Sequence, residues 1–477
     1  MSKDQYFCFK EKMNNNSKIH FEISERRMIL YLFDIIFVLG ALFCIGFFFD
    51  FEYLEMTTAH FGWQIVFAIY LLVFGTIFEM YNLQVASNES QIVRSALLTV
   101  VSAVSIYLMT PVFSPELPSN RIEILVLYSV VLIALLGWRL FYVRYLASNR
   151  FFQNAILICD KGQVQELVLG LETIDPHYKI IAYVSTENNR PQNSAFENYI
   201  QEIDKNDLTT FIRQNTVSEI VIASQKADGI TTVLYQQLLL LLESGYVIRE
   251  YTQVYESKTY RIPVQFIERD FYRFFPFSRN NQNRLYLFFL RFFEISISII
   301  GLFIGLLLIP FVMIGNAIGN RGKLFYTQER VGKNGDVFEI YKFRTMVKNA
   351  ESKGNVFTVN NDKRVTSFGK FLRKTRIDEF PQFVNILKGD MAIIGPRPER
   401  PFFVKRIAKE MPFYETRHVI KPGLTGWAQV NYSYGETIED SLIKLQYDLY
   451  YIKHRSIYLD LNIILKTITT VLFYRGQ

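Results

Sequence analysis

Cysteine, histidine and charged residues are all scarce in this chain of 477 residues. The three cysteines have no paired spacing, which argues against a disulfide framework or a zinc site. No two of the five histidines have the H-x-x-x-H spacing, so a histidine-based zinc hydrolase is disfavoured. The chain also lacks a nucleic-acid-binding motif and a short apolar run ending in a small-residue cleavage site. We therefore expect neither a nucleic-acid partner nor a cleaved signal.

Apolar residues are abundant instead. Half of the residues are hydrophobic and 16% are aromatic, which is too apolar for an ordinary soluble enzyme. A membrane part combined with a water-facing part fits this composition. The net charge of +7 and the pI of about 9.0 suit an anionic membrane surface or an anionic substrate.

Four apolar segments follow a basic N-terminal arm and approach the length of a spanning helix. They cover residues 28–49, 61–78, 95–113 and 122–143. Buried core helices are the alternative, but four such segments joined by short loops favour membrane spans. Basic residues flank the first and last segments, whereas the first outer loop carries Asp50, Glu52 and Glu55. By the positive-inside rule, both ends of this bundle face the cytoplasm. Asp34 lies within the first span, where we favour a contact inside the bundle over an ion pathway.

Short apolar strands alternate with helical stretches between residues 152 and 255. The segments NAILIC and EIVIA read as buried strands, which predicts a Rossmann-like α/β domain. The G-x-G-x-x-G fingerprint is missing, since only Gly162 follows the first strand. NAD binding has little support, and a structural or regulatory role is favoured.

A fifth apolar stretch covers residues 285–319 and contains Pro310, where we expect a break or kink. A fifth crossing would place the acidic residues of the C-terminal part outside the cell. A helix that enters one leaflet and returns would keep them inside, so a re-entrant helix is favoured over a full span. The final apolar stretch, 459–473, is predicted to lie along the membrane interface.

The segment 370–400, KFLRKTRIDEFPQFVNILKGDMAIIGPRPER, concentrates the chemistry. Its adjacent acids Asp378 and Glu379 lie between Arg373 and Arg397. Arginine binds phosphate oxygens, and a carboxylate can attack phosphorus or hold a divalent metal. The alternative is a charge pair that only stabilises a helix end. The other candidate substrate-binding residues are Lys342, Arg344, Asp448 and Asp460, for which exposed strand charges, helix caps or surface pairs are competing interpretations.

These segments together resemble the bacterial sugar transferase family, the monotopic phosphoglycosyl transferases. The resemblance rests on KLFYTQERVGKNGDVFEIYKFRTM, the 370–400 segment, KPGLTGWAQVN and YDLYYIKHRSIYLDL with the terminal RGQ, and it covers about 285–477. The preceding spans and the α/β domain resemble the long polyprenyl-phosphate hexose-1-phosphate transferase branch, of the exopolysaccharide-biosynthesis type.

The resemblance implies that a UDP-sugar gives its sugar-1-phosphate to undecaprenyl phosphate in the bacterial inner membrane, releasing UMP. It implies that Asp378 forms a covalent phosphosugar intermediate, that Glu379 belongs to a Mg²⁺ site, and that the Pro-broken helix is re-entrant. It places Lys342, Arg373, Arg397, Asp448 and Asp460 around the phosphates or the metal. Two departures are Ile309 before the proline and Asn431-Tyr432 where many members have Asn-Gly-Arg, so the choice of sugar stays open.

The predicted fold class is a membrane protein with a four-helix transmembrane bundle, a Rossmann-like α/β domain and a mainly α monotopic catalytic domain on the cytoplasmic face. The predicted boundaries are 1–27 for the arm, 28–145 for the bundle, 152–255 for the α/β domain, 256–284 for a linker and 285–477 for the catalytic domain. A homo-oligomer, with a dimer favoured, is expected because a noncatalytic domain often serves assembly. A sugar-nucleotide oxidoreductase or epimerase and a membrane scaffold are the alternative functions.

Overall fold

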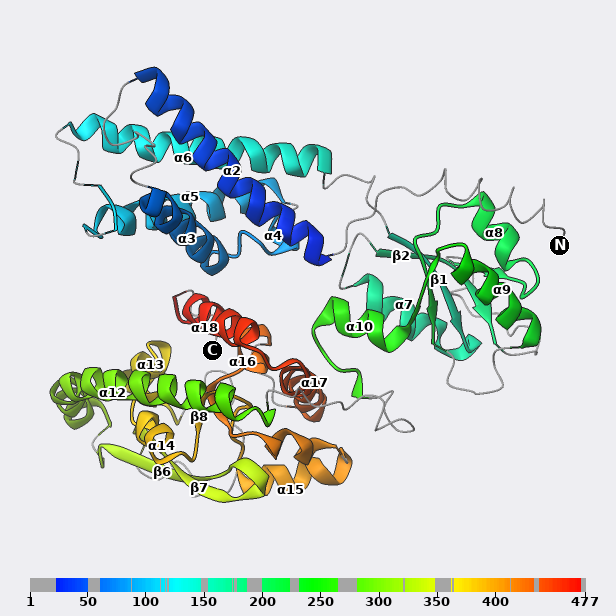
Figure 1. Cartoon of the computed structure of the whole chain (residues 1–477). Coiled ribbons are helices and arrows are strands. Elements are labelled where there is room, and N and C mark those ends of the chain that lie inside the picture. Colours follow the sequence, from blue (N-terminus) through cyan, green and yellow to red (C-terminus); the bar gives the residue numbers. More distant parts are fainter. Residues whose placement is uncertain are drawn as a thin grey trace. The chain divides into compact units, whose positions relative to one another are not determined.

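The computed structural model describes most of the chain, and its two compact units are Met1–Thr259 and Tyr260–Gln477 (Figure 1). The described residues are 23–49, 61–86, 88–111, 113–115, 117, 120–146, 153–173, 175, 178–186, 200–223, 231–264, 281–320, 322–347, 362, 364–411, 413–432 and 437–472. Most of the predicted arm and linker, the acidic first loop and the terminal RGQ lie outside these residues.

Helices occupy all four apolar segments of the first unit. They are α2 (Ile23–Phe49), α3 (Phe61–Ile77), α5 (Glu89–Leu108) and α6 (Arg121–Phe141), with the short α4 (Leu83–Ala86) between α3 and α5. The third helix starts six residues earlier than predicted, because the Asn88 side chain accepts hydrogen bonds from two backbone amides of its first turn. Among the described helices, α2, α5, α6 and α12 of the second unit are long and apolar enough to cross a membrane. At 17 residues, α3 is shorter but still within the range that can span.

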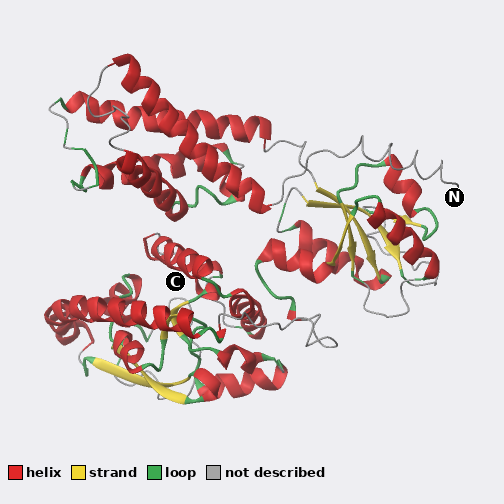
Figure 2. Ribbon diagram, in the orientation of Figure 1, coloured by secondary structure: helices red, strands yellow, loops and turns green. Residues whose placement is uncertain are grey.

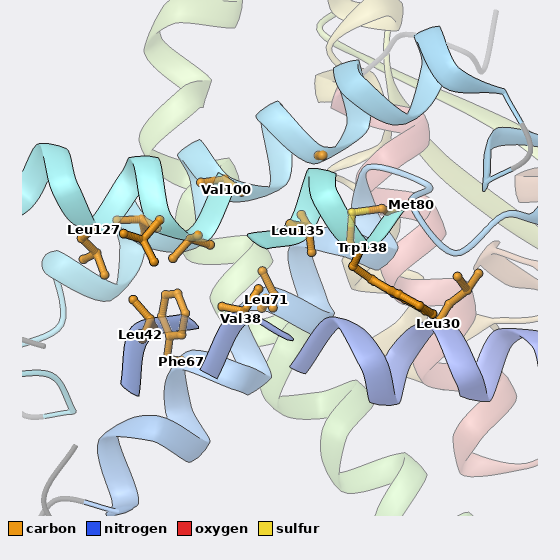
Figure 3. Close-up of a cluster of buried hydrophobic side chains, with 14 of the residues drawn as sticks. Leu30, Val38, Leu42, Phe67, Leu71, Met80, Val100, Leu127, Leu135 and Trp138 are labelled. Atoms are coloured by element: carbon orange, nitrogen blue, oxygen red, sulfur yellow. The ribbon is translucent and has the colours of Figure 1, made fainter. Parts of the chain in front are cut away.

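The bundle core contains a buried ion pair as well as apolar side chains. Figure 3 shows the apolar cluster, in which Leu30 of α2 lies near Trp138 of α6, and Val38 lies near Leu71 of α3. Arg139 donates from Nη2 and Nε to the two oxygens of Asp34, at 2.6 and 2.9 Å, and both side chains are fully buried. A third nitrogen donates to the Met80 carbonyl at 3.0 Å. The expected contact of Asp34 within the bundle is therefore confirmed.

The rest of the first unit is a five-stranded, all-parallel sheet with the order β3-β2-β1-β4-β5. Its strands are β1 (Gln153–Cys159), β2 (Tyr178–Ser185), β3 (Gln201–Ile203), β4 (Glu219–Ile222) and β5 (Val247–Glu250). Helices α7 (Val164–Glu172) and α10 (Tyr251–Thr259) lie on one side, and α8 (Leu208–Gln214) and α9 (Thr232–Glu243) on the other (Figures 1 and 2). This doubly wound arrangement confirms the predicted Rossmann-like architecture.

The second unit is mainly helical and begins with the long helix α12 (Arg284–Gly315), followed by a π-helical turn, η10 (Asn316–Asn320). An antiparallel hairpin follows, and two short strands pair later in the chain. The remaining elements are β6 (Phe325–Val331), β7 (Val337–Phe343), α13 (Ser367–Lys374), η12 (Ile377–Glu379), α14 (Gln382–Lys388), β8 (Ala392–Ile394), α15 (Pro401–Glu410), η13 (Tyr414–Val419), β9 (Gly423–Thr425), α16 (Trp427–Asn431), α17 (Ile438–His454) and α18 (Ile457–Leu472).

Helix α12 continues through Pro310, so the expected break is not an interruption of the helix. A proline removes one hydrogen bond, while the turns on either side keep theirs, which allows the helix to continue. Large apolar side chains along α12 are exposed, including Phe303 at 62% and Leu306 at 63%. Exposed apolar surface of this extent fits a lipid environment.

Two glycines on α12 are in close contact with aromatic rings of the segment that holds the acidic pair. A Cβ on Gly301 would lie 2.4 Å from the Phe383 ring, and one on Gly305 would contact Phe380 at 3.4 Å. Phe380 directly follows Glu379 in the sequence. The membrane helix therefore supports the backbone of the acidic pair through close packing.

Candidate active site

A tight turn between α13 and α14 presents the two acids. Helix α13 ends at Lys374, and Arg376 takes a left-handed conformation with φ of 58°. Such a conformation costs a non-glycine residue about 1–3 kcal/mol and is held by its surroundings. Asp378 and Glu379 follow in the 3-10 turn η12, so their side chains leave the backbone in different directions.

Three cations surround Glu379. The nitrogens of Lys342, Arg376 and Arg397 lie 3.5, 3.5 and 3.7 Å from its carboxylate oxygens. Burial by itself raises the pKa of Glu379, but these cations outweigh it and lower the pKa to about 2. Burial lowers the pKa of Lys342, and the charge of Glu379 opposes that shift. Glu379 is thus held in its ionised form at the centre of a cluster of positive charge.

Asp378 has the opposite environment. Its side chain is 7% exposed, and its Oδ1 atom is buried without a hydrogen-bond partner among the described residues. Burial first, and then the negative charge of Glu379, raise the pKa of Asp378 to about 6. The two neighbouring acids therefore differ in environment, since cations hold one ionised and burial removes the other from water.

Arg397 is held by residues that are distant in the sequence. Its Nη1 donates to Gln429 Oε1 at 3.3 Å, and its carbonyl accepts from Arg417 Nη2 at 3.0 Å. Arg417 also forms an ion pair with Asp448 at 2.7 Å and donates to the Tyr414 hydroxyl at 2.6 Å. Asp448 therefore supports the site indirectly, because it pairs with Arg417 and Arg417 bonds to the Arg397 carbonyl.

The other predicted site residues have separate partners. Arg373 donates to Thr345 Oγ1 at 3.0 Å, and its charge still acts on the pKa of Asp378. Arg344 donates to the Lys323 carbonyl at 3.0 Å and contacts the Tyr326 ring. Asp460 accepts hydrogen bonds from Tyr286 and Tyr451. Within the described part of the chain, these contacts of Arg344 and Asp460 do not include the acidic pair.

Several further polar residues of this region carry no clear signal in the sequence. Arg330 donates to the Pro398 carbonyl at 3.0 Å and lies 3.7 Å from Glu399, so it braces the turn that carries Arg397. Arg417 is 4% exposed and was not singled out, because TRHV reads as an ordinary surface segment. For Arg330, the sequence offers one signal, which is a basic residue inside the strand segment YTQERV.

The residues fit a divalent cation that the substrate helps to bind. No group of three or more acidic, histidine or cysteine ligands exists among the residues that the structure describes. Asp378 and Glu379 still offer oxygen atoms, and Asp378 Oδ1 has no hydrogen-bond partner in the described part of the chain. Mg²⁺ is commonly held by one or two carboxylates together with substrate phosphates and water. The donor set of the acidic pair suits that mode.

The fold and the site together define a membrane-associated protein with an acidic pair set among phosphate-binding cations. The model of the family described as bacterial sugar transferase matches residues 285–474. The protein named uncharacterized sugar transferase EpsL, of Bacillus subtilis (strain 168), is 39% identical over 157 residues, which cover 32% of this chain and 72% of EpsL. The chain belongs to the bacterial sugar transferase family.

Longer relatives match over the same region. The UDP-N-acetylgalactosamine-undecaprenyl-phosphate N-acetylgalactosaminephosphotransferase of Aeromonas hydrophila is 46% identical over 190 residues, which cover 39% of this chain and 44% of that protein. The UDP-glucose:undecaprenyl-phosphate glucose-1-phosphate transferase of Escherichia coli (strain K12) is 38% identical over 153 residues, covering 32% and 33% of the two chains. The matches thus span less than half of these two relatives.

Proposed function

We propose that this protein transfers a sugar-1-phosphate from a UDP-sugar to undecaprenyl phosphate, releasing UMP and starting the assembly of an exopolysaccharide or surface glycan. The observation that carries the proposal is the difference between the two acids: among the described residues the buried Asp378 Oδ1 has no hydrogen-bond partner, whereas Glu379 is surrounded by cations. The names of the Aeromonas and Escherichia relatives, which specify undecaprenyl phosphate and UDP-sugars, support this choice of substrates.

The proposed reaction consists of two displacements. Asp378 attacks the phosphorus next to the sugar, so an O–P bond forms while the bond to the bridging oxygen breaks and its electron pair leaves with UMP. An oxygen of the lipid phosphate then attacks the same phosphorus and releases the Asp378 carboxylate. Lys342 and Arg397 lie where they would hold the diphosphate oxygens. Mg²⁺ held at Glu379 would offset the negative charge of the meeting anions.

The same proposal places the acidic pair at the membrane surface. The exposed apolar length of α12 supports a helix seated in lipid. If that helix enters one leaflet and returns, as we propose, its packing against Phe380 and Phe383 would hold the site beside the lipid headgroups. The basic residue Arg144, in the helical turn that follows α6, supports a cytoplasmic site. We also propose that the protein forms a dimer. Light scattering in detergent that shows only monomer would argue against the dimer.

The proposed activity is tested by measuring UMP release from a panel of UDP-sugars with undecaprenyl phosphate and Mg²⁺. Lipid-dependent release from one sugar is the expected result, and it would also identify the donor. Omission of the lipid should leave at most a single turnover, because UMP from the first displacement does not require the acceptor. Absence of UMP with every donor, in the presence of folded protein, would contradict the proposed reaction.

The rate is expected to depend on the ionisation of Asp378. Because the carboxylate form attacks and its pKa is raised to about 6, kcat/KM should fall about tenfold per unit as the pH decreases below that value. The measurement is a pH profile of UMP release at constant Mg²⁺, together with the thermal stability at each pH. A profile that stays flat well below pH 6, with the protein folded throughout, would show that no such ionisation limits the reaction.

A further inference from the structure

Two buried polar atoms in the segment 370–400 have no hydrogen-bond partner among the described residues. One is Asp378 Oδ1, an acceptor, and the other is Gln382 Nε2, a donor. Gln382 is only 3% exposed, so bulk water does not satisfy its amide. Buried polar groups are nearly always paired, and each exception calls for a ligand, an ion or a water.

The two atoms belong to residues of one continuous turn. Residues Ile377–Glu379 form a 3-10 turn, Pro381 has helical angles of −61° and −17°, and α14 starts at Gln382. Asp378 and Gln382 are four residues apart along this tightly wound backbone, so both side chains leave the same short turn. The structure nevertheless shows no hydrogen bond between the Asp378 and Gln382 side chains. A group that lies beside both would satisfy the donor and meet the acceptor.

A second unpaired amide lies on the Arg397 side of Glu379. Gln429 Oε1 accepts from Arg397 Nη1 at 3.3 Å, whereas its Nε2 is buried without a partner in the described structure. Arg397 is in turn 3.7 Å from Glu379. A second buried amide without a partner among the described residues is thus bonded, through its oxygen, to one of the cations beside Glu379.

A neutral donor has a chemical advantage beside the attacking carboxylate. A cation in contact with Asp378 would form an ion pair with it and reduce its nucleophilicity, whereas an amide stabilises an anionic oxygen with little effect on the charge of the site. In phosphoryl transfer, the charge spreads over the oxygens around phosphorus that do not take part in the bonds being made and broken. A donor beside the nucleophile is placed to bind one of those oxygens.

We propose that the side-chain amide of Gln382 is a further catalytic residue, which donates a hydrogen bond from Nε2 to a non-bridging oxygen of the phosphoryl group that Asp378 attacks. This inference rests on the proposed function. The amide keeps both of its protons throughout, while the Asp378–phosphorus bond forms and the bond to UMP breaks. Because the oxygen gains charge as the bonds change, the hydrogen bond strengthens in the transition state and acts mainly on kcat.

The test compares Gln382→Met, which keeps the length of the side chain without its donor, with Gln382→Glu, which presents a carboxylate to the phosphate. Gln382→Met is expected to lower kcat at least about tenfold, with a smaller change in KM for the UDP-sugar. Single-turnover formation of the phosphosugar adduct should slow by the same factor. Gln382→Glu should lose more, because like charges repel. Lys388→Gln, on the exposed face of the same helix, is the matched control and should keep the wild-type rate.

The outcomes separate this inference from the proposed function. If wild-type protein releases no UMP with any donor, the proposed function fails. If the wild type is active and Gln382→Met is folded with an unchanged kcat, the amide has no catalytic role and the inference is wrong. If Gln382→Met does not fold, the test relies on Gln382→Glu. Formation of the phosphosugar adduct at the wild-type rate in that variant would overturn the inference.

Discussion

Asp378→Asn is expected to abolish UMP release, with a loss of at least about 10³-fold. Asparagine has nearly the shape of aspartate but lacks the anionic oxygen that attacks phosphorus, so the first displacement has no nucleophile. The measurements are steady-state UMP release and the intact mass of the denatured protein after incubation with donor alone. Wild-type protein should gain the mass of one phosphosugar, and the variant should gain none.

The stability of this variant is an internal control. Folding raises the pKa of Asp378 from 3.8 to about 6, so the ionised carboxylate destabilises the native state above that pH. Asp378→Asn should therefore be at least as stable as the wild type at pH 7, and any advantage should disappear as the pH falls below 4. Such a gain in stability with a loss of activity is typical of catalytic groups. A variant that is folded and still forms the adduct would exclude Asp378 as the nucleophile.

Arg417→Met is expected to destabilise the second unit and to inactivate the site together. The side chain of Arg417 is 4% exposed and that of Asp448 is 2% exposed, and they are 2.7 Å apart. Removal of one partner of a buried ion pair leaves an uncompensated charge and typically costs about 3–5 kcal/mol. The same change removes the donor to the Arg397 carbonyl, so the guanidinium beside Glu379 loses its support. Denaturant unfolding and UMP release measure the two effects.

A double variant separates the two effects. Arg417→Met with Asp448→Leu replaces the ion pair by apolar side chains, which should recover most of the lost stability. Activity should remain low, since the Arg397 carbonyl still lacks its donor. Recovery of full activity in the double variant would show that the pair contributes stability only and that Arg397 needs no support from Arg417.

The local patterns of the sequence were sufficient for the elements and for the acidic pair. Apolar runs of about 20 residues predicted the helices of the bundle, and two apolar strands predicted the parallel sheet. These signals succeed because the period and length of apolar segments depend on neighbours in the chain. The order β3-β2-β1-β4-β5 was beyond these patterns, since strands pair through contacts between distant segments.

The same limit explains the site. By itself, the sequence determined that two adjacent acids lie among basic residues, and the family resemblance followed from those local motifs. Only the tertiary structure decided that Lys342 and Arg397 meet Glu379, whereas Asp448 pairs with Arg417 and Asp460 bonds to two tyrosines. A carboxylate in a sequence looks the same whether it holds a metal or an arginine. Its partner is set by packing between segments that are tens of residues apart, and that packing also leaves Asp378 Oδ1 buried without a hydrogen-bond partner among the described residues.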